Sequence, residues 1–324
     1  MSEDIVIVGL ARTPMGGLLG ELSNLSAPEL GAVAVKAAMK EAKLDSADQI
    51  IMGNVLSAGQ GQAPARQAAL KAGLSKATEA VTLNKMCGSG LQAVAMARQA
   101  LLANEAEIVI AGGMESMSRA PFLMTKHRGG QKYGHDKLHD HMALDGLEDA
   151  YEGLAMGVYA DQSAKEYQFT RETQDQYALE TLSRAQSASN EGRFKREIAP
   201  VETKAGVVDT DELPRKARPE KIPSLKPAFT QDGTVTAANA SAISDGAAAL
   251  VLMRASDAKK RGLKPIARIV AQSSHAQEPS KFTSAPVPAI KKALDRAGWK
   301  ASDVDLWEIN EAFAVVPLIA MRDL

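Results

Sequence analysis

Short apolar segments alternate with amphipathic stretches through the first part of this chain, and this alternation constrains the fold more than any other feature. Four apolar segments lack the polar residue at every second position that marks a sheet with one wet face: Ile5–Leu10, Gln49–Val55, Ala80–Asn84 and Glu107–Ala111. Strands of this kind are usually buried on both faces. The order of elements therefore predicts parallel strands joined by crossover helices that cover both faces of one sheet.

Three helices are expected between these strands. The first follows Ser26, whose hydroxyl can cap free backbone amides while Glu29 reaches back and Pro28 is tolerated in the first turn. The second should begin near Pro64 and stop at Gly73, a residue suited to a left-handed cap. The third is expected from about Gly88 to Ala103.

The pattern changes between about Gly113 and Gly233, where clusters of proline, glycine and charged residues surround two helical stretches. These helices are expected at about Glu152–Tyr167 and Arg171–Glu191. We interpret this region as a domain inserted over the sheet. Within it, Lys204–Lys226 is rich in basic residues but interrupted by acidic ones, so a solvated loop is its ordinary interpretation.

One pattern occurs twice. The helical segment Val35–Ala42 matches Ile290–Ala297, and the strand expected at Ile266–Ala271 matches Ile5–Leu10. Two copies of a β-α-β unit packed face to face would make a five-layered α/β body. The second copy stops before the counterpart of the turn that follows Ala80–Asn84, so we expect that the unit is unfinished.

Composition excludes several classes of function. With 324 residues, of which 45% are hydrophobic and 24% charged, the chain can bury a sizeable core. A formal net charge of −1 gives no general attraction for nucleic acid or an anionic membrane surface. No apolar stretch approaches the ~20 residues of a spanning helix, so no membrane partner and a cytoplasmic location are expected. The single cysteine forms no intramolecular disulfide.

That cysteine, Cys87, stands in a turn between a short strand and a helix. At a helix N-terminus the unpaired amides and the helix dipole stabilise a thiolate, which favours a nucleophile. Gly88 and Gly90 leave room for a substrate carbonyl to approach the backbone, as in nucleophile elbows. The alternative is a buried structural cysteine with glycines that permit close packing.

A thiol nucleophile needs a base, and no histidine has a convincing setting for one. Four of the five lie in the loop-rich insertion, while His275 follows a predicted strand and is either a site residue or a loop residue. A metal site is not expected, because the neighbouring histidines lack accompanying cysteines or a helical His-Glu-x-x-His spacing: His135, His139 and His141.

Two polar turns are further candidates. The segment Asn310–Ala314 follows a strand predicted at Val304–Ile309, at the sheet edge where ligands usually bind. An amide there can orient a water toward an oxyanion. The segments Asn239–Ser241 and Ser244–Gly246 form the second polar turn, and both turns are also compatible with ordinary loops.

Five segments together resemble the thiolase family in order and spacing. They are Asn84–Gly90 (NKMCGSG), Gly112–Ser118 (GGMESMS), Asp232–Ser241 (DGTVTAANAS), Asp245–Ala248 (DGAA) and Asn310–Ala314 (NEAFA). The resemblance covers essentially the whole chain. It implies a thiolase-like α/β fold with duplicated βαβαβαβ units in an αβαβα arrangement.

The resemblance also implies roles for seven residues. Cys87 would carry the acyl group as a thioester, and Asn310 would hold an oxyanion-hole water. Ser241 would contact the pantetheine or adenine end of coenzyme A, and Arg215 would contact the phosphates of coenzyme A. Met156 and Phe229 would line a pantetheine tunnel, and Phe313 would shape the acyl pocket. The segment Gly146–Ala150 looks like the biosynthetic, acetoacetyl-coenzyme A type, although Ala155 stands where that type often has histidine.

The resemblance implies an acetyl-coenzyme A C-acetyltransferase that forms or cleaves a carbon–carbon bond through an acyl-cysteine. Acetyl-coenzyme A and acetoacetyl-coenzyme A are the expected substrates, with no metal or redox cofactor, no nucleic acid partner, a role in fatty acid metabolism, and a homodimer or homotetramer as the assembly.

We expect a first unit at residues 1–113 completed by 246–262, a coenzyme A-binding insertion at 114–245, and the start of a second unit at 263–324. The family's Gly-His-Pro and Cys-x-Gly-Gly-Gly segments have no counterpart before Leu324. The 324-residue chain is therefore expected to be acylated without turning over. The alternative is a non-catalytic acyl-coenzyme A-binding protein.

Overall fold

The computed structural model describes residues 3–324 and divides them into two compact units. The first comprises residues 3–146, 192–213 and 243–269. The second comprises Leu147–Glu191, Pro214–Ala242 and Val270–Leu324. Each unit is described by itself below. The division into family units at residues 113, 245 and 263 stays a prediction.

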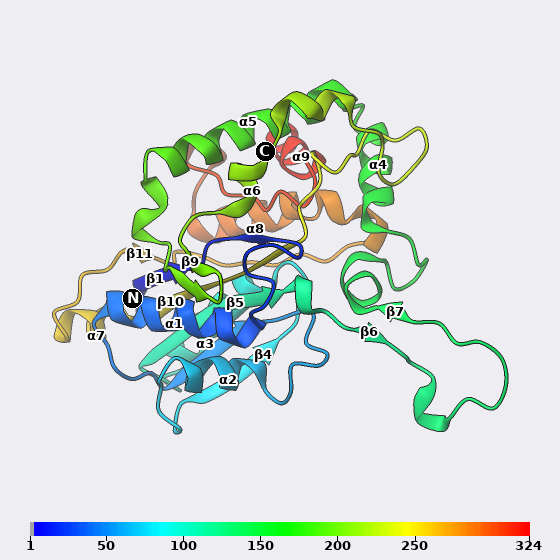
Figure 1. Cartoon of the computed structure of the whole chain (residues 1–324). Coiled ribbons are helices and arrows are strands. Elements are labelled where there is room, and N and C mark those ends of the chain that lie inside the picture. The colour runs from blue at the N-terminus through cyan, green and yellow to red at the C-terminus, as the bar shows by residue number, and fades with distance from the viewer. Residues whose placement is uncertain (1–2) are drawn as a thin grey trace. The chain divides into compact units, whose positions relative to one another are not determined.

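The first unit is built on a mixed sheet with the strand order β11-β1-β10-β5-β3-β4, to which β2 adds on β10 (Figure 1). The strands are β1 (Ile5–Arg12), β2 (Gly16–Gly17), β3 (Gln49–Gly53), β4 (Glu79–Leu83), β5 (Ile108–Ser116), β10 (Ser244–Arg254) and β11 (Ala267–Arg268).

The four strands predicted first all form. Strand β3 pairs in parallel with β4 and β5, while β10 lies antiparallel between β1 and β5, so β1 and β5 run in the same direction. The expectation of parallel strands alone is wrong at β10. An antiparallel strand needs no crossover helix, and β10 enters the sheet directly after the long excursion through the second unit.

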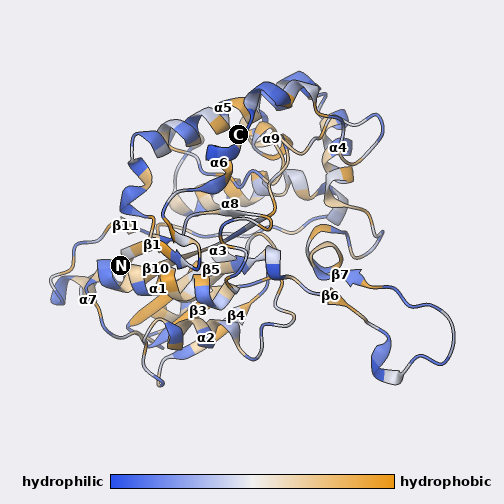
Figure 2. Cartoon of the chain, in the orientation of Figure 1, coloured by the Kyte–Doolittle hydropathy of each residue, from blue (hydrophilic) through white to orange (hydrophobic). Residues whose placement is uncertain are grey.

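Helices cover both faces of the sheet, as the unbroken apolar strands predicted. They are α1 (Ala27–Ala42), α2 (Pro64–Lys71), α3 (Ser89–Leu102) and the short α7 (Ala255–Lys260). Helices α1 and α2 pack on one face and α3 on the other (Figure 1). Hydropathy follows the same pattern, since the central strands are coloured largely as hydrophobic in Figure 2.

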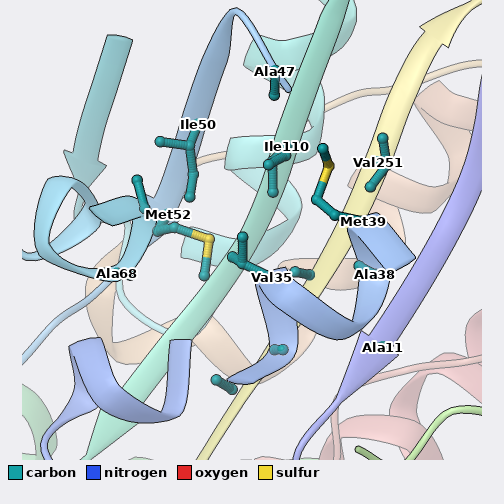
Figure 3. Close-up of a cluster of buried hydrophobic side chains, with 14 of the residues drawn as sticks. Ala11, Val35, Ala38, Met39, Ala47, Ile50, Met52, Ala68, Ile110 and Val251 are labelled. Carbon is teal, nitrogen blue, oxygen red and sulfur yellow. The ribbon is translucent and has the colours of Figure 1, made fainter. Parts of the chain in front are cut away.

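The larger core lies between α1 and the sheet. Figure 3 shows Val35, Ala38 and Met39 of α1 facing Ile50 and Met52 of β3, with Ile110 of β5 and Val251 of β10 alongside. Burying such a side chain stabilises the fold by about 1.5–3 kcal/mol. On the opposite face, α3 contributes Ala93, Ala97 and Leu101, all fully buried.

The helix ends follow the signals in the sequence. Glu29 accepts hydrogen bonds from the Ser26 amide at 2.8 Å and from the Ser26 hydroxyl at 2.7 Å, which fixes the start of α1. Beyond the end of α2, Gly73 has φ of 90°. That left-handed conformation strains any residue with a side chain, so a glycine is suited to the position.

Strand β1 ends at a partly buried arginine. Arg12 Nε lies 2.6 Å from Glu197, its Nη1 lies 2.7 Å from Asp211, and its guanidinium stacks 4.9 Å from the centre of the Phe194 ring. Burial opposes the charge, but hydrogen bonds and attraction from both carboxylates raise the pKa of Arg12. This cluster ties residues 193–211 to the sheet. The first unit also contains two small hairpins: β6 (Phe122–Leu123) with β7 (His139–Asp140), and β8 (Val201–Thr203) with β9 (Gly206–Val208).

The second unit is mostly helical. Its helices are α4 (Met156–Glu166), α5 (Arg171–Asn190), α8 (Pro286–Ala297) and α9 (Val315–Asp323), while α6 (Glu212–Lys216) spans the boundary between the units. Both helices predicted in the insertion are confirmed by α4 and α5, and the repeated helix is confirmed by α8. Phe313, Val315 and Val316 pack against Ala160 and Ala164 of α4 in the core of this unit.

Two predicted strands differ from the structure. The segment Val304–Ile309 forms no strand, and Leu306 within it is 87% exposed. No strand among residues 3–324 pairs with it, and an extended segment without a partner has no hydrogen-bonded ladder. Of Ile266–Ala271, only Ala267 and Arg268 form a strand, which pairs with β1 of the first sheet.

Candidate functional site

Cys87 lies in a tight turn between β4 and α3, directly before Gly88, the residue that caps the helix. Its side chain is exposed, so the buried structural alternative does not describe it. The Lys85 amide donates to Ser89 Oγ at 2.8 Å, and that hydroxyl donates to the Met86 carbonyl at 2.6 Å. Met86 has a left-handed φ of 49°, a conformation that persists only where neighbouring groups enforce it.

Glycines form the floor beneath this turn. A Cβ at Gly53, the last residue of β3, would lie 2.6 Å from Ser89 Cβ. Gly113 of β5 pairs with Gly53, and a Cβ there would lie 3.7 Å from Gly90. The start of α3 therefore sits directly on the end of β3 and on the neighbouring part of β5, which brings Cys87 to the carboxyl edge of β3.

The Asn310 segment belongs to the second unit. Asn310 is exposed, and the residue after it is held by several bonds. Tyr177 Oη donates to the Glu311 carboxylate at 2.7 Å, and Thr181 Oγ1 donates to it at 2.9 Å. Ser241 Oγ donates to the Glu311 carbonyl at 2.6 Å. Burial and the bond to Glu311 raise the pKa of Tyr177, so its hydroxyl stays a donor.

The Asn310–Ala314 turn meets Asn239–Ser241 here, whereas Ser244–Gly246, predicted as part of the second turn, form the start of strand β10 instead. The Ser241 amide donates to the Ala312 carbonyl at 2.9 Å, and the Ala314 amide donates to the Asn239 carbonyl at 2.8 Å. Asn239 is 3% exposed, and its side chain donates to Asp175 of α5 at 3.0 Å. A cavity of about 40 Å³ lies between α5 and these turns.

Three of the predicted coenzyme A residues lie in this unit with aromatic or apolar neighbours. The Phe229 and Phe313 rings are 5.9 Å apart at 80°, an edge-to-face pair. Met156, at the start of α4, packs against the cluster that contains Phe313. Phe313 is 8% and Phe229 37% exposed, so the pair offers one buried and one accessible ring.

The remaining predicted residues are more dispersed. Ser241 is exposed beside Glu311, and Arg215 is exposed on the short helix α6. Cys87 belongs to the first unit, so the six other predicted residues lie in a different compact unit from the cysteine. Within residues 3–324, no group of three or more histidine, cysteine, aspartate or glutamate side chains is placed to hold a metal ion.

The histidines occupy varied settings. His141 is buried, with Nδ1 2.6 Å from Asp145 and Nε2 accepting the Ala58 amide at 3.3 Å. His127 pairs with Asp136 at 3.2 Å. His275 is half-buried, with Nε2 3.0 Å from Gln277 and Nδ1 3.2 Å from Lys292. None of these contacts involves Cys87.

Sequence reasoning missed the residues that support the site. Tyr177 and Thr181 lie four residues apart on one face of α5, whereas Asp175 lies on a different face, and this spacing alone does not show what they bind. Their partners, Asn239 and Glu311, are distant in sequence. Glu115 was noted only as part of the GGMES segment, yet its carboxylate binds the loop after β3. Only the tertiary contacts reveal these roles.

No helix within residues 3–324 has both the length and the apolar character needed to cross a membrane.

Comparison with known proteins agrees with this geometry. The thiolase N-terminal domain model matches residues 5–256, and the thiolase C-terminal domain model matches residues 263–324. A solved structure, the Acat5 thiolase of Ascaris suum in complex with coenzyme A, superposes with a TM-score of 0.96 at 41% identity, covering 99% of this chain and 84% of that one. The predicted thiolase-like α/β fold is confirmed.

Curated relatives are equally similar. Acetyl-CoA acetyltransferase 2 of Arabidopsis thaliana is 49% identical over 325 residues, which is 98% of this chain and 81% of the relative. Acetyl-CoA acetyltransferase of Cupriavidus necator is 49% identical over 329 residues, or 99% of this chain and 84% of the relative. Matches of this extent to two domain models and to full-length enzymes show that the chain belongs to the thiolase family of acyltransferases.

Proposed function

We propose that this protein is an acetyl-coenzyme A C-acetyltransferase whose nucleophile is Cys87. The observation that carries the proposal is the placement of the chain's one cysteine, exposed at the N-terminus of α3. Amides at that terminus stabilise a thiolate. The relatives at 49% identity bear the name of this enzyme, which favours the catalytic over the non-catalytic alternative.

In the proposed reaction, the Cys87 thiolate attacks an acyl-coenzyme A, expels the coenzyme A thiolate and becomes a thioester. A second acetyl-coenzyme A then loses an α-proton, which in the overall balance ends on the expelled coenzyme A thiolate. The resulting carbanion attacks the thioester and releases the cysteine thiolate, and when the cysteine carries an acetyl group the product is acetoacetyl-coenzyme A. The reverse sequence is thiolysis. Coenzyme A thioesters are the substrates, and the chemistry calls for no metal or redox cofactor.

The roles of the other residues follow from the family. The Cys87 amide would line one oxyanion hole, and Asn310 would hold the water of another. Ser241 and Arg215 would contact coenzyme A. Met156 and Phe229 would line its pantetheine arm, and Phe313 would shape the acyl pocket. The edge-to-face pair of Phe229 and Phe313 supports the last two assignments, because an apolar wall suits an alkyl chain. The Ascaris suum relative was solved with coenzyme A, which supports a coenzyme A site.

The test is covalent acylation of the 324-residue protein. Incubation with acetyl-coenzyme A should add one acetyl group to the peptide that contains Cys87, as measured by mass spectrometry, and release one equivalent of free coenzyme A. Cys87→Ser should show no release. Iodoacetamide should label Cys87 at neutral pH faster than a free thiol, and acetyl-coenzyme A should protect it. An unmodified cysteine peptide after prolonged incubation would sink the proposal.

A homodimer or homotetramer is proposed as the assembly, working in the cytoplasm in fatty acid metabolism. Strand β4 is an edge of the sheet with Val81 44% exposed, and an unpaired edge favours pairing with another chain. In the first unit, the segment 120–142 also exposes apolar side chains: Phe122, Met124 and Leu138. Light scattering at micromolar concentration measures the assembly, and a monomer there contradicts it.

A further inference from the structure

A carboxylate on β5 holds the loop that follows β3. Glu115 Oε2 accepts the Val55 amide at 2.8 Å, and Oε1 accepts the Leu56 amide at 3.2 Å and the Asn54 side-chain amide at 2.8 Å. Three successive residues of one loop thus donate to a single side chain. No lysine or arginine within residues 3–324 forms an ion pair with Glu115, so its hydrogen bonds to neutral groups are what fix its position.

The same loop supports the Cys87 turn. Asn54 is 3% exposed, and its backbone amide donates to the Leu83 carbonyl at 3.0 Å, which extends the pairing of β3 with β4 by one step. Leu83 is the last residue of β4, and the turn to Cys87 begins immediately after it. One residue earlier, Gly53 lies against Ser89 at the start of α3. A shift of residues 53–54 would therefore move both Leu83, before the turn, and Ser89, after it.

The far end of the loop is held separately. The Ala58 amide donates to His141 Nε2 at 3.3 Å, so this nitrogen is the acceptor and Nδ1 carries the proton that faces Asp145 at 2.6 Å. Residues 54–58 are thus tied at one end by Glu115 and at the other by His141.

The turn needs such support. Met86 adopts a left-handed φ of 49° without being a glycine, which costs about 1–3 kcal/mol and persists only when surrounding structure enforces it. The bonds of Ser89 to residues 85 and 86 lie within the turn and move with it. An external anchor must come from the sheet, and the Asn54–Leu83 bond is one.

We propose that Glu115 is a positioning residue for the nucleophile: by holding Asn54, Val55 and Leu56 it keeps the Cys87 turn aligned with the amides of α3. Its hydrogen bonds go to residues 54–56 and not to Cys87. The inference rests on the proposed function in one respect, which is that Cys87 is the reactive thiol.

The experiment measures the rate of iodoacetamide labelling of Cys87 as a function of pH in the 324-residue protein. The chain has one cysteine, so the signal is unambiguous. Glu115→Gln places a donating amide group where an acceptor is needed. The labelling rate at neutral pH should fall about fivefold, the effect expected for the loss of one ordinary hydrogen bond of about 1 kcal/mol. The midpoint of the pH profile should move to higher pH.

A second variant and a control make the result specific. Asn54→Ala keeps Glu115 and the backbone amides but removes one donor, and should slow labelling in the same direction by a smaller factor. If Glu115→Gln does not fold, the labelling rate of Asn54→Ala alone tests the positioning role. Glu79→Gln changes an exposed glutamate on β4 and should leave the rate and the profile unchanged. Thermal melts of all variants identify any global unfolding, which exposes the thiol without restoring its alignment.

The outcomes separate the two proposals. If the unchanged protein labels faster than a free thiol and both variants label equally fast, the positioning role is overturned while the proposed function stands. If Cys87 of the unchanged protein labels no faster than a free thiol, the proposed nucleophile is wrong, and this inference fails with it. Slowing in both variants, with Glu79→Gln unaffected, supports the inference.

Discussion

The paired glycines beneath α3 give a sharp prediction, because one tolerates a methyl group and the other does not. Gly53 and Gly113 face each other on β3 and β5. A Cβ at Gly53 would lie 2.6 Å from Ser89 Cβ and 2.9 Å from the Ser89 carbonyl carbon, whereas a Cβ at Gly113 would meet nothing closer than 3.7 Å. We expect Gly53→Ala to be destabilising and Gly113→Ala to be tolerated.

The magnitude follows from these distances. Carbon atoms in contact rest about 3.5–4.0 Å apart, so Ser89 must retreat by about 1 Å in Gly53→Ala. Overpacking of this kind costs about 1–3 kcal/mol. Replacing glycine in a strand also gains about 0.5–1 kcal/mol of backbone entropy, but both variants share this gain. The difference in unfolding free energy between them therefore isolates the clash, at about 1–3 kcal/mol.

Urea denaturation of the two variants measures that difference directly. Iodoacetamide labelling tests the functional consequence, since Cys87 lies two residues before Ser89 and must move with it. We expect slower labelling of Cys87 in Gly53→Ala than in Gly113→Ala. Equal unfolding free energies for the two proteins would refute the reasoning, because they would show that α3 is free to move away from the sheet.

Four further predictions concern individual side chains. Arg12→Ala leaves Asp211 largely buried without its partner and should lower the free energy of unfolding, measured by urea denaturation, by about 3–5 kcal/mol. Arg184→Ala, in an exposed pair with Glu180, should lower it by at most about 1 kcal/mol, and similar losses in both variants would contradict the importance of the Arg12 cluster. Tyr177→Phe removes a hydrogen bond to the Glu311 carboxylate and should lower the free energy of unfolding by about 1.5–3 kcal/mol in urea denaturation. Tyr151→Phe, at an 82% exposed site, should leave stability unchanged. An unchanged stability of Tyr177→Phe would contradict the anchoring of the Asn310 segment by Tyr177. Arg215→Ala should weaken coenzyme A binding about tenfold in calorimetry and leave pantetheine binding unchanged. Lys221→Ala is the control and should bind coenzyme A as the unchanged protein does. An unchanged affinity of Arg215→Ala for coenzyme A would remove Arg215 from the site. Burial raises the pKa of Glu115 above its ordinary value of 4.5, so the folded state binds this proton more tightly than the unfolded chain does. The free energy of unfolding should therefore fall as pH rises from 4.5 toward the raised pKa. Glu115→Gln should lose this pH dependence of stability, and an identical dependence in both proteins would contradict the assignment.

Local patterns in the sequence were sufficient for most elements of the fold. The capping residues Ser26 and Glu29 located the start of α1, Gly73 marked the end of α2, and unbroken apolar runs identified β1, β3 and β5 as buried strands. These predictions succeeded because capping, left-handed φ and burial on both faces depend on residues close together in the chain. The same kind of run in β4 lies at the sheet edge and is exposed or half-buried, so burial on both faces was wrong for that strand. The strand predicted at Val304–Ile309 failed because a strand also requires a neighbour, which its own residues do not encode.

The candidate site divides in the same way. The sequence by itself determined that Cys87 stands at a helix N-terminus, since a strand, a turn and a helix follow one another there. Only the tertiary structure showed that Gly53 and Gly113 form the floor of that turn, that Glu115 binds residues 54–56, and that Tyr177 and Thr181 hold Glu311. The contacts of Glu115 and Glu311 join residues about 60 or more positions apart in the printed sequence, and the contact of Gly53 with Ser89 spans 36 positions. Hydrogen-bond geometry and steric exclusion act over a few ångströms in space, so which distant residues meet is decided by the packing of the whole chain.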